Sequence, residues 1–409
     1  MRVLVLGLNY APEPIGIAVY TTGLCEALVR AGHDVSVVSG KPYYPGWQVA
    51  AGYSGGWTRT VENGVSVTRC PLYVPRNPTG LKRIVHHVSF ALSALIPAIR
   101  AAVGTRPDVV LTVAPSLMAA PVAALAARLS GAASWVHVQD FEVEAAVATD
   151  LVDAKSPIIR MARAIEATIL KMFGTASSIG PEMCRKLADK VRRTDVVEFR
   201  NWSDVSATLP APGATDYRRF WSIDTPHVAL YSGNIANKQG IEIVLDAAIL
   251  LAGRRDLTFV ICGQGPNRAM LEQRAGGSAN IRFHDLQPRE ALADLLALAT
   301  VHLLPQKAGA ADLVLPSKLT NMLASGRPVV ATAAPGTGLA REVEGCGVLT
   351  PPGDAPAFAA AIETLIDDPV RYAAASHHAR LQATERWDRS AILGDVIARL
   401  AAIAAARSK

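Results

Sequence analysis

A short polar turn carries one lysine, Lys238, between two apolar segments of the chain. The segment before it, HVALY (227–231), is typical of a buried strand, and SGNIANKQG (232–240) follows directly. The turn should end at a helix N-terminus, where unpaired N–H groups and the helix dipole favour an anion such as phosphate. An ordinary strand–turn–helix corner with a solvated lysine is the alternative. The helix is predicted by apolar residues at the spacing of one buried face, namely Ile241, Val244, Leu245, Ala248 and Ile249.

Glycines follow two other predicted strands. Gly263 and Gly265 lie in ICGQGPNR (261–268), and Gly16 lies in LNYAPEPIGIAVY (8–20), just before a predicted helix. Glycine lets the backbone approach a ligand closely, but it is also ordinary at a tight turn or a helix entry. The spacing is not the GxGxxG pattern of dinucleotide-binding loops.

A second lysine, Lys318, lies in the first turn of the helix predicted in PSKLTNMLASGRPVVAT (316–332). Pro316 and Ser317 suit a helix start, and Asn321 follows Lys318 on the same face one turn later. A cation in the first turn opposes the helix dipole, and a bound anion would offset that cost. Lys318 is therefore a candidate anion-binding residue, with Asn321 beside it.

Carboxylates and a histidine cluster in HVQDFEVE (137–144), where the predicted strand SWVHVQD ends. His137 and Asp140 could bind sugar hydroxyls or transfer a proton. Residues of these types near a strand end are also often ordinary hydrogen-bonding partners.

Two series of strands alternating with helices must position these residues. The alternation predicts an α/β fold with two Rossmann-like domains, each a parallel sheet covered by helices on both faces. Ligands of such sheets bind beyond the carboxyl ends of the strands, where the candidate residues lie. The first series is RVLVLGL, DVSVVSG, VSVTRC, DVVLTVAP, SWVHVQD and VVEFRNW, and the second is HVALYSG, LTFVICGQGP, IRFHDL, VHLLP, RPVVAT and GVLTPP.

The domain boundaries follow from a change in composition near the middle of the chain. ATLPAPGATDYRR (207–219) is rich in Pro, Ala and Gly and is typical of a linker. We expect an N-terminal domain over 1–204, a linker over 205–225, a C-terminal domain over 226–386 and a helix over 387–409 that could cross back to the first domain.

Composition limits the classes of protein to which the chain can belong. The chain has 409 residues, half of them hydrophobic, so it is a globular protein of two or three domains. Its five cysteines lack metal-binding spacing, and their odd number favours a reducing compartment. The start of the chain is typical of a buried strand rather than a signal peptide. The net charge of +6 is diffuse and lies mostly in the first half, so we expect no nucleic-acid partner.

Two apolar helical segments, 82–103 and 156–173, carry interspersed basic residues. They could rest on a membrane surface, or they could pack on the sheet with basic outer faces. The basic residues are Lys82, Arg83, Arg100, Arg160, Arg163 and Lys171.

The order of these motifs resembles a known family. The chain resembles the retaining glycosyltransferases of family 4, which have the GT-B fold. The motifs that carry this resemblance are GNIANKQGIE, CGQGP, LPSKLTNMLASGRPVVAT and FRNWSD. GLNYAPEPIGIAVYT, KPYYPGW, CPLYVPRNPTGLKR and VHVQDFEVEA resemble the colanic-acid biosynthesis fucosyltransferase type. The resemblance runs through nearly the whole chain.

The resemblance implies sugar transfer from a nucleotide sugar in a cleft between two domains, without a bound metal or other cofactor. The second domain would hold the donor, and the domain over 1–204 would be the acceptor-side domain. Lys238, five residues after Gly233, matches the family lysine on the diphosphate, while Asn234 stands where an arginine usually follows that glycine. As a catalytic group, Lys238 would stabilise the charge that grows on the departing diphosphate.

The chain departs from the family at two glutamates. Asn321 stands where the ribose glutamate would be, and Leu313 stands at the other position, with Asp312 one place out of register. Asn321 could still bond ribose hydroxyls as a neutral amide.

The resemblance favours GDP-fucose as donor and a polysaccharide or lipid-linked oligosaccharide as acceptor. The enzyme would work in the cytoplasm, at the inner face of the plasma membrane if it contacts lipid. His137 and Asp140 would serve the sugar side. A non-hydrolysing sugar-nucleotide 2-epimerase and a non-catalytic nucleotide-sugar-binding subunit are the alternatives.

Overall fold

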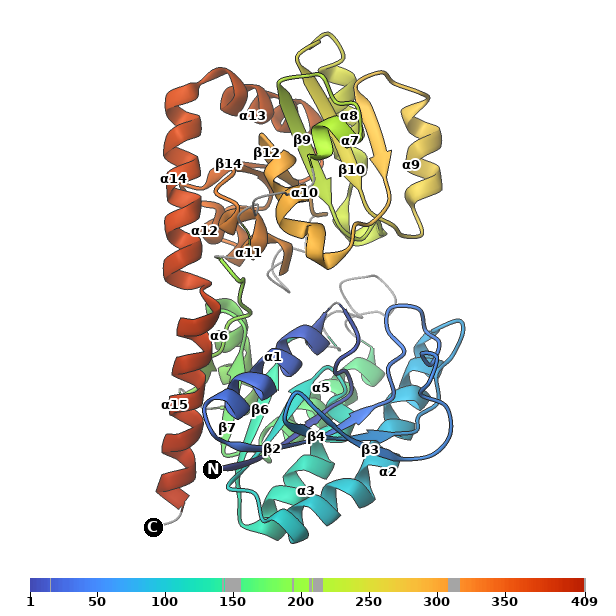
Figure 1. Ribbon diagram of the computed structural model, residues 1–409, viewed down its shortest axis with the longest axis vertical. Helices are drawn as coiled ribbons and strands as arrows, with labels where there is room; N and C mark the ends of the chain where they lie inside the picture. The colour runs from blue at the N-terminus through green and yellow to red at the C-terminus, as the bar shows by residue number, and fades with distance from the viewer. Residues whose placement is uncertain are drawn as a thin grey trace. The chain divides into compact units, whose positions relative to one another are not determined.

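The computed structural model describes the chain except residues 15, 142, 144–155, 193–194, 206–207, 209–215, 308–316 and 408–409, and except the side chains of Lys238, Arg289 and Ser317. The chain forms two compact units (Figure 1). One unit is Met1–Arg200 with Ser390–Lys409, and the other is Asn201–Arg389. The C-terminal segment thus belongs to the first unit.

The first unit contains one sheet of eight strands in the order β3-β4-β2-β1-β5-β6-β7-β8. Its strands pair in parallel, except that β3 runs antiparallel to β4 at the edge. The chain order reverses between β1 and β5, the switch point at which doubly wound sheets bind ligands. The strands are β1 (Arg2–Gly7), β2 (Asp34–Gly40), β3 (Thr58–Glu62), β4 (Val65–Cys70), β5 (Val109–Ala114), β6 (Ala133–Val138), β7 (Thr175–Ser178) and β8 (Val197–Glu198).

Helices cover this sheet. α2 contacts α3 and the strands β1, β2 and β4. α15 buries Leu393, Val396 and Leu400, and Arg407 near its end donates a hydrogen bond to the carbonyl oxygen of Ala132. The helices are α1 (Ile17–Arg30), α2 (Gly80–Thr105), η1 (Leu117–Ala119), α3 (Ala120–Ser130), α5 (Pro157–Leu170), α6 (Pro181–Val191) and α15 (Arg389–Arg407).

The second unit has a parallel sheet of six strands in the order β11-β10-β9-β12-β13-β14. This is the doubly wound order, with its switch point between β9 and β12. The strands are β9 (His227–Ser232), β10 (Leu257–Cys262), β11 (Ile281–His284), β12 (Val301–Leu304), β13 (Val329–Thr332) and β14 (Gly347–Thr350). Its helices are α7 (Tyr217–Phe220), η2 (Asn237–Gln239), α8 (Glu242–Leu250), α9 (Arg268–Ala275), η3 (Arg289–Ala291), α10 (Leu292–Leu298), α11 (Ser317–Ala324), α12 (Gly338–Val343), α13 (Ala355–Asp367) and α14 (Pro369–Arg386).

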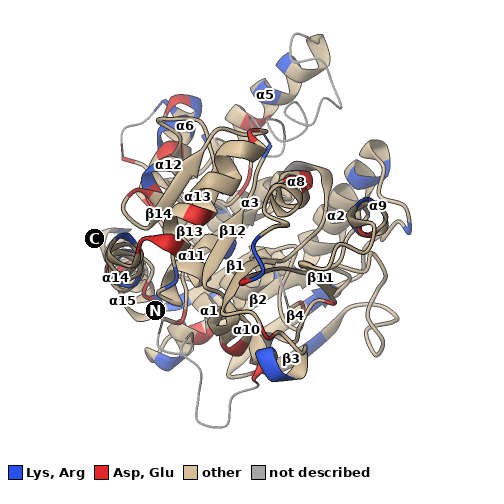
Figure 2. Ribbon diagram, turned by 90° about the horizontal axis from the view of Figure 1, so that it is seen from above, with Lys and Arg blue, Asp and Glu red and all other residues tan. Residues whose placement is uncertain are grey.

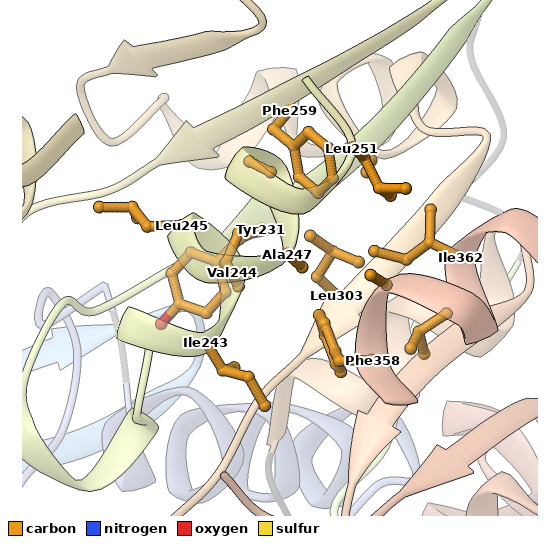
Figure 3. Packing of buried hydrophobic residues seen from close by; sticks show 14 of the residues in the cluster. Tyr231, Ile243, Val244, Leu245, Ala247, Leu251, Phe259, Leu303, Phe358 and Ile362 are labelled. Carbon is orange, nitrogen blue, oxygen red and sulfur yellow. The ribbon is translucent and has the colours of Figure 1, made fainter. Parts of the chain in front are cut away.

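Alternate residues of the central strand β9 pack into different cores. Ala229 and Tyr231 join the core that α8 and α13 cover, part of which Figure 3 shows. Val228 and Leu230 join the core that contains residues of α7 and α10. Because successive strand residues point to opposite faces, helices cover both faces of this sheet. Basic residues lie on elements of both units, for example on α5 and α9 (Figure 2).

The predicted strands are all present, and the structure adds β3 and β7. The helix after Lys238 begins only at Glu242, because the 3-10 turn η2 comes first. The prediction that Ile249 is buried was wrong, since half of this residue is exposed. Part of the predicted linker belongs to the second unit, where Tyr217 and Ile223 are buried.

Candidate functional site

The loops after β9 and β10 touch through two glycines. A Cβ atom on Gly263 would lie 1.9 Å from the carbonyl oxygen of Gly233, and one on Gly265 would lie 2.1 Å from that of Ile235. The backbone N–H of Gly233 donates to the carbonyl of Cys262 at 2.9 Å. Chain packing alone therefore requires glycine at 263 and 265.

Lys318 reaches this pair of loops from the first turn of α11. Its Nζ donates to the hydroxyl of Tyr231 at 2.7 Å and lies 4.2 Å from the centre of that ring. A Cβ atom on Gly233 would be 2.5 Å from Nζ, and Gly233 has a φ of 135°, which favours glycine. The ammonium group thus lies directly over the loop that follows β9.

The hydroxyl of Tyr231 holds the ammonium group of Lys318 in place. Its ring is fully buried beside Val244, while its hydroxyl points away from Phe358 (Figure 3). The hydroxyl donates to the carbonyl oxygen of Asn234 at 2.5 Å, and burial raises the pKa of Tyr231 well above its usual value. The phenol therefore stays protonated, and it links the ammonium to the backbone of the loop. The sequence analysis missed Tyr231, although an aromatic residue with a polar tip, next to the last residue of a strand, was a usable signal.

Asn321 lies on the same helix and has a partner within the second unit. Its Oδ1 accepts a hydrogen bond from the Oγ of Ser203 at 2.7 Å. The backbone N–H of Ser203 donates to the carbonyl of Trp387 at 2.9 Å. Because Ser203 engages the oxygen of Asn321, a ribose contact would use its amide N–H groups.

The structure thus brings together most of the residues expected in the second domain. The residues that meet at the carboxyl ends of β9 and β10 are Gly233, the exposed Asn234, Gly263, Gly265 and Lys318. Lys238 belongs to η2 and Ser317 begins α11, but their side chains lie outside the described part of the structure. Asp312 and Leu313 also lie outside the described residues.

His137 differs from its expected placement at a strand-end loop. It lies within β6, 2% exposed, where Nδ1 is 2.9 Å from the Oγ of Ser177 and the ring packs 4.5 Å from that of Phe199. Burial lowers the pKa of His137 to about 3. A neutral, enclosed imidazole in the core of the sheet suits a packing role better than proton transfer.

Asp140 does lie beyond the end of β6, and it lines a small pocket. Phe141 and Glu166 of α5 line the same pocket, together with apolar residues. Glu166 is buried and pairs with the Nζ of Lys190 at 2.5 Å, and that Nζ lies 5.2 Å from the ring centre of Phe141. Asp140 therefore lies at the end of its strand, as expected, whereas His137 does not.

Gly16 precedes α1 with a φ of 68°, which explains the need for glycine there. The neighbouring Glu13 is a buried carboxyl that the sequence analysis did not single out. It accepts hydrogen bonds from the backbone N–H groups of Tyr43 and Tyr44, both at 2.9 Å, and from Asn9 at 2.8 Å. Burial raises the pKa of Glu13. Glu13 thus joins the loop after β1 to the loop after β2.

The part of the chain that the structure describes contains no group of three or more His, Cys, Asp or Glu residues that could hold a metal ion. Its five cysteines are all free thiols.

Both units match models of known families. The model described as glycosyl transferases group 1 matches residues 226–368, and the model described as glycosyl transferase 4-like domain matches residues 16–202. An Escherichia coli (strain K12) protein named as the colanic acid biosynthesis glycosyl transferase WcaI is 40% identical over 373 residues, which cover 88% of this chain and 91% of that protein.

Solved structures share the fold at low sequence identity. Sucrose-phosphate synthase from Thermosynechococcus elongatus superimposes with a TM-score of 0.75 and 18% identity, over 98% of this chain and 100% of that one. HepE from Anabaena, solved in complex with UDP and glucose, gives a TM-score of 0.70 and 16% identity, over 98% and 100% of the two chains. Family models that match both units, and a relative aligned over most of the chain, show that this protein is a glycosyltransferase of family 4 with the GT-B fold.

Proposed function

We propose that the enzyme transfers a sugar, with retention of configuration, from a nucleotide sugar whose diphosphate lies at the Lys318–Gly233 contact. The observation that carries this proposal is the ammonium group of Lys318, held over a glycine loop at the switch point of the second sheet. Ligands of doubly wound sheets bind at this place, and a fixed cation there favours an anion. A solved structure with the same fold is described as a complex with UDP and glucose.

The chemistry needs little beyond fixed positive charge. Breaking the bond between the anomeric carbon and the phosphate oxygen leaves negative charge on the diphosphate, and a cation that already points there lowers the barrier. Tyr231 holds Lys318 in place before the reaction, so little reorganisation is needed as the bond breaks. Lys238, on η2, is the second cation we assign to this role, and Ser317 and Asn321 belong to the same donor site.

The acceptor is proposed from the resemblance and from the curated relative. The E. coli protein is named for colanic acid biosynthesis, so we propose a polysaccharide or lipid-linked oligosaccharide of a bacterial exopolysaccharide as acceptor. GDP-fucose is the first donor to test. Free thiols suit a reducing cytoplasm, where the enzyme would work at the inner face of the plasma membrane. Asp140, in the first unit, would act on the sugar side.

The test is incubation of the enzyme with a panel of GDP-, UDP- and dTDP-sugars and a lipid-linked oligosaccharide extract. We expect one donor to release its nucleoside diphosphate, in the presence of EDTA as well as without it. NMR of the product should show the anomeric configuration of the donor. An inverted anomeric configuration in the product would contradict the retaining mechanism. Loss of turnover in EDTA would contradict a metal-independent reaction.

A further inference from the structure

Helix α2 presents an apolar stripe to solvent along most of its length. At 100° per residue the exposed apolar side chains fall within about a third of the helix circumference. The opposite side of the helix is buried and includes Phe90, Ala94 and Ala98. The stripe consists of Leu81, which is 73% exposed, Leu92, which is 68% exposed, and Ile84, Val85, Val88, Ile96 and Val103.

Packing holds α2 on its domain. Among the described residues, α2 is the one helix long and apolar enough to cross a membrane, by length and composition alone. Its inner face nevertheless contacts α3, β1, β2 and β4, and a spanning helix would lose those contacts. A helix with one face packed and one apolar face free suits a position in the plane of a membrane surface.

Two aromatic residues lie beside the stripe. Trp57 is 55% exposed, and its indole Nε1 donates to the carbonyl oxygen of Ser93 on α2 at 2.9 Å. Tyr73 is also exposed, and its backbone N–H donates to the Oγ of Ser89 at 2.8 Å. Tryptophan and tyrosine are enriched at the level of lipid headgroups, because their rings combine apolar area with a polar tip.

The charged residues of α2 have one sign. α2 contains no acidic residue, and its exposed Lys82 and Arg100 project from the same flank of the stripe. Two copies of the chain facing each other through this stripe would bring like charges together. An anionic lipid surface would instead attract them.

We propose that the stripe of α2, with Trp57 and Tyr73, docks on an anionic phospholipid surface with the helix parallel to the membrane. The biological meaning of this docking rests on the proposed function, because it would bring the acceptor-side domain to a lipid-linked acceptor. Vesicle binding needs neither a donor nor turnover. A failure of the docking proposal is therefore distinguishable from a failure of the proposed reaction.

The test is co-sedimentation of the full chain with vesicles of phosphatidylethanolamine and phosphatidylglycerol, compared with vesicles of phosphatidylcholine. We expect binding to the anionic vesicles that salt weakens, and weak binding to the neutral ones. The double variant Leu92→Glu/Ile96→Glu should reduce anionic-vesicle binding by about tenfold or more. The matched control Ile249→Glu/Leu250→Glu, which changes two exposed apolar residues of α8, should leave it unchanged.

A second pair of variants tests the charge. Lys82→Ser/Arg100→Ser should weaken binding to the anionic vesicles by roughly tenfold. The control Arg30→Ser/Arg255→Ser removes the same charge from exposed residues outside α2 and should weaken binding much less. All the variants should unfold near the wild-type temperature, since every substituted side chain is exposed.

Unchanged vesicle binding in Leu92→Glu/Ile96→Glu would overturn the proposal, and so would equal binding to the neutral and anionic vesicles. A wild-type dimer that dissociates in this variant, without vesicle binding, would assign the stripe to a second copy of the chain and would also overturn it.

Discussion

At the scale of single residues, Lys318 owes its position to a residue far away in the chain. Tyr231 lies 87 residues earlier, and its hydroxyl both accepts from the lysine and donates to the loop carbonyl of Asn234. The two bonds hold the ammonium over Gly233. A cation fixed at this place attracts a diphosphate.

Tyr231→Phe should weaken nucleoside diphosphate binding by roughly tenfold, because the lysine loses its anchor while the ring still fills the core. The control is Tyr372→Phe in the same unit, where the hydroxyl also accepts from a cation, Arg327, and donates to a backbone carbonyl, that of Thr300. Calorimetric titration measures the affinity, and thermal unfolding measures the stability. If both variants lose stability alike and neither loses affinity, Tyr231 has only a structural role.

Lys238→Ala should lower kcat by roughly a hundredfold, the scale of losing one preorganised stabilising group, and should weaken diphosphate binding by a smaller factor. The reason is that charge on the leaving oxygen grows as the bond breaks. Lys238→Arg should recover part of the loss. Arg255→Ala, which removes an exposed cation of the same unit, serves as the control in the same steady-state assay. Near-normal turnover in folded Lys238→Ala would show that the segment 232–240 is an ordinary strand–turn–helix corner.

At the scale of elements, the sequence predicted the strands that have a strong apolar signal and the loops at their ends. It did not predict β7, whose sequence TASS is small and polar, or β3, an exposed edge strand that owes its pairing to β4. The predicted strand SWVHVQD extends to Asp140, whereas β6 ends at Val138, because the sequence does not show where a strand ends. Contacts such as that between Lys318 and Gly233 depend on packing between distant segments, which periodicity cannot reveal.

Gly263→Ala should destabilise the protein by about 2 to 4 kcal/mol, because its Cβ would meet the carbonyl oxygen of Gly233 at 1.9 Å and the backbone would have to move. Gly253→Ala is the matched control, since nothing lies within 4 Å of its Cβ, and its effect should stay within about 0.5 kcal/mol. Denaturant unfolding of both variants measures the difference. Equal stability of the two variants would contradict the close approach of the loops.

At the scale of the whole molecule, two doubly wound sheets carry different residues at their switch points. The second unit has the fixed ammonium of Lys318, whereas the first has the buried carboxyl of Glu13 after β1. The prediction of two α/β domains is confirmed. Each unit also encloses a neutral histidine, His137 in the first and His302 in the second.

These histidines should make the stability depend on pH. Burial lowers the pKa of each to about 3, whereas an unfolded histidine has a pKa near 6.5. The unfolded chain therefore binds more protons between these values, so the contribution is fully present above about pH 6.5 and is lost as the pH falls toward about 3. As the pH falls through that range, the difference in unfolding free energy between the wild type and His302→Asn should become smaller. A constant difference would show that His302 does not titrate in this way.

The central claim is that the second unit holds the donor diphosphate while Asp140 of the first unit acts on the sugar. Calorimetric titration of GDP, with UDP and dTDP as alternatives, into the wild type, Lys318→Ala and Asp140→Asn tests it most directly. We expect one nucleoside diphosphate to bind the wild type, the affinity of Lys318→Ala to fall about tenfold or more, and that of Asp140→Asn to stay close to the wild type, although its turnover falls about tenfold. Wild-type affinity in folded Lys318→Ala, or an equal loss of affinity in Asp140→Asn, would contradict the claim.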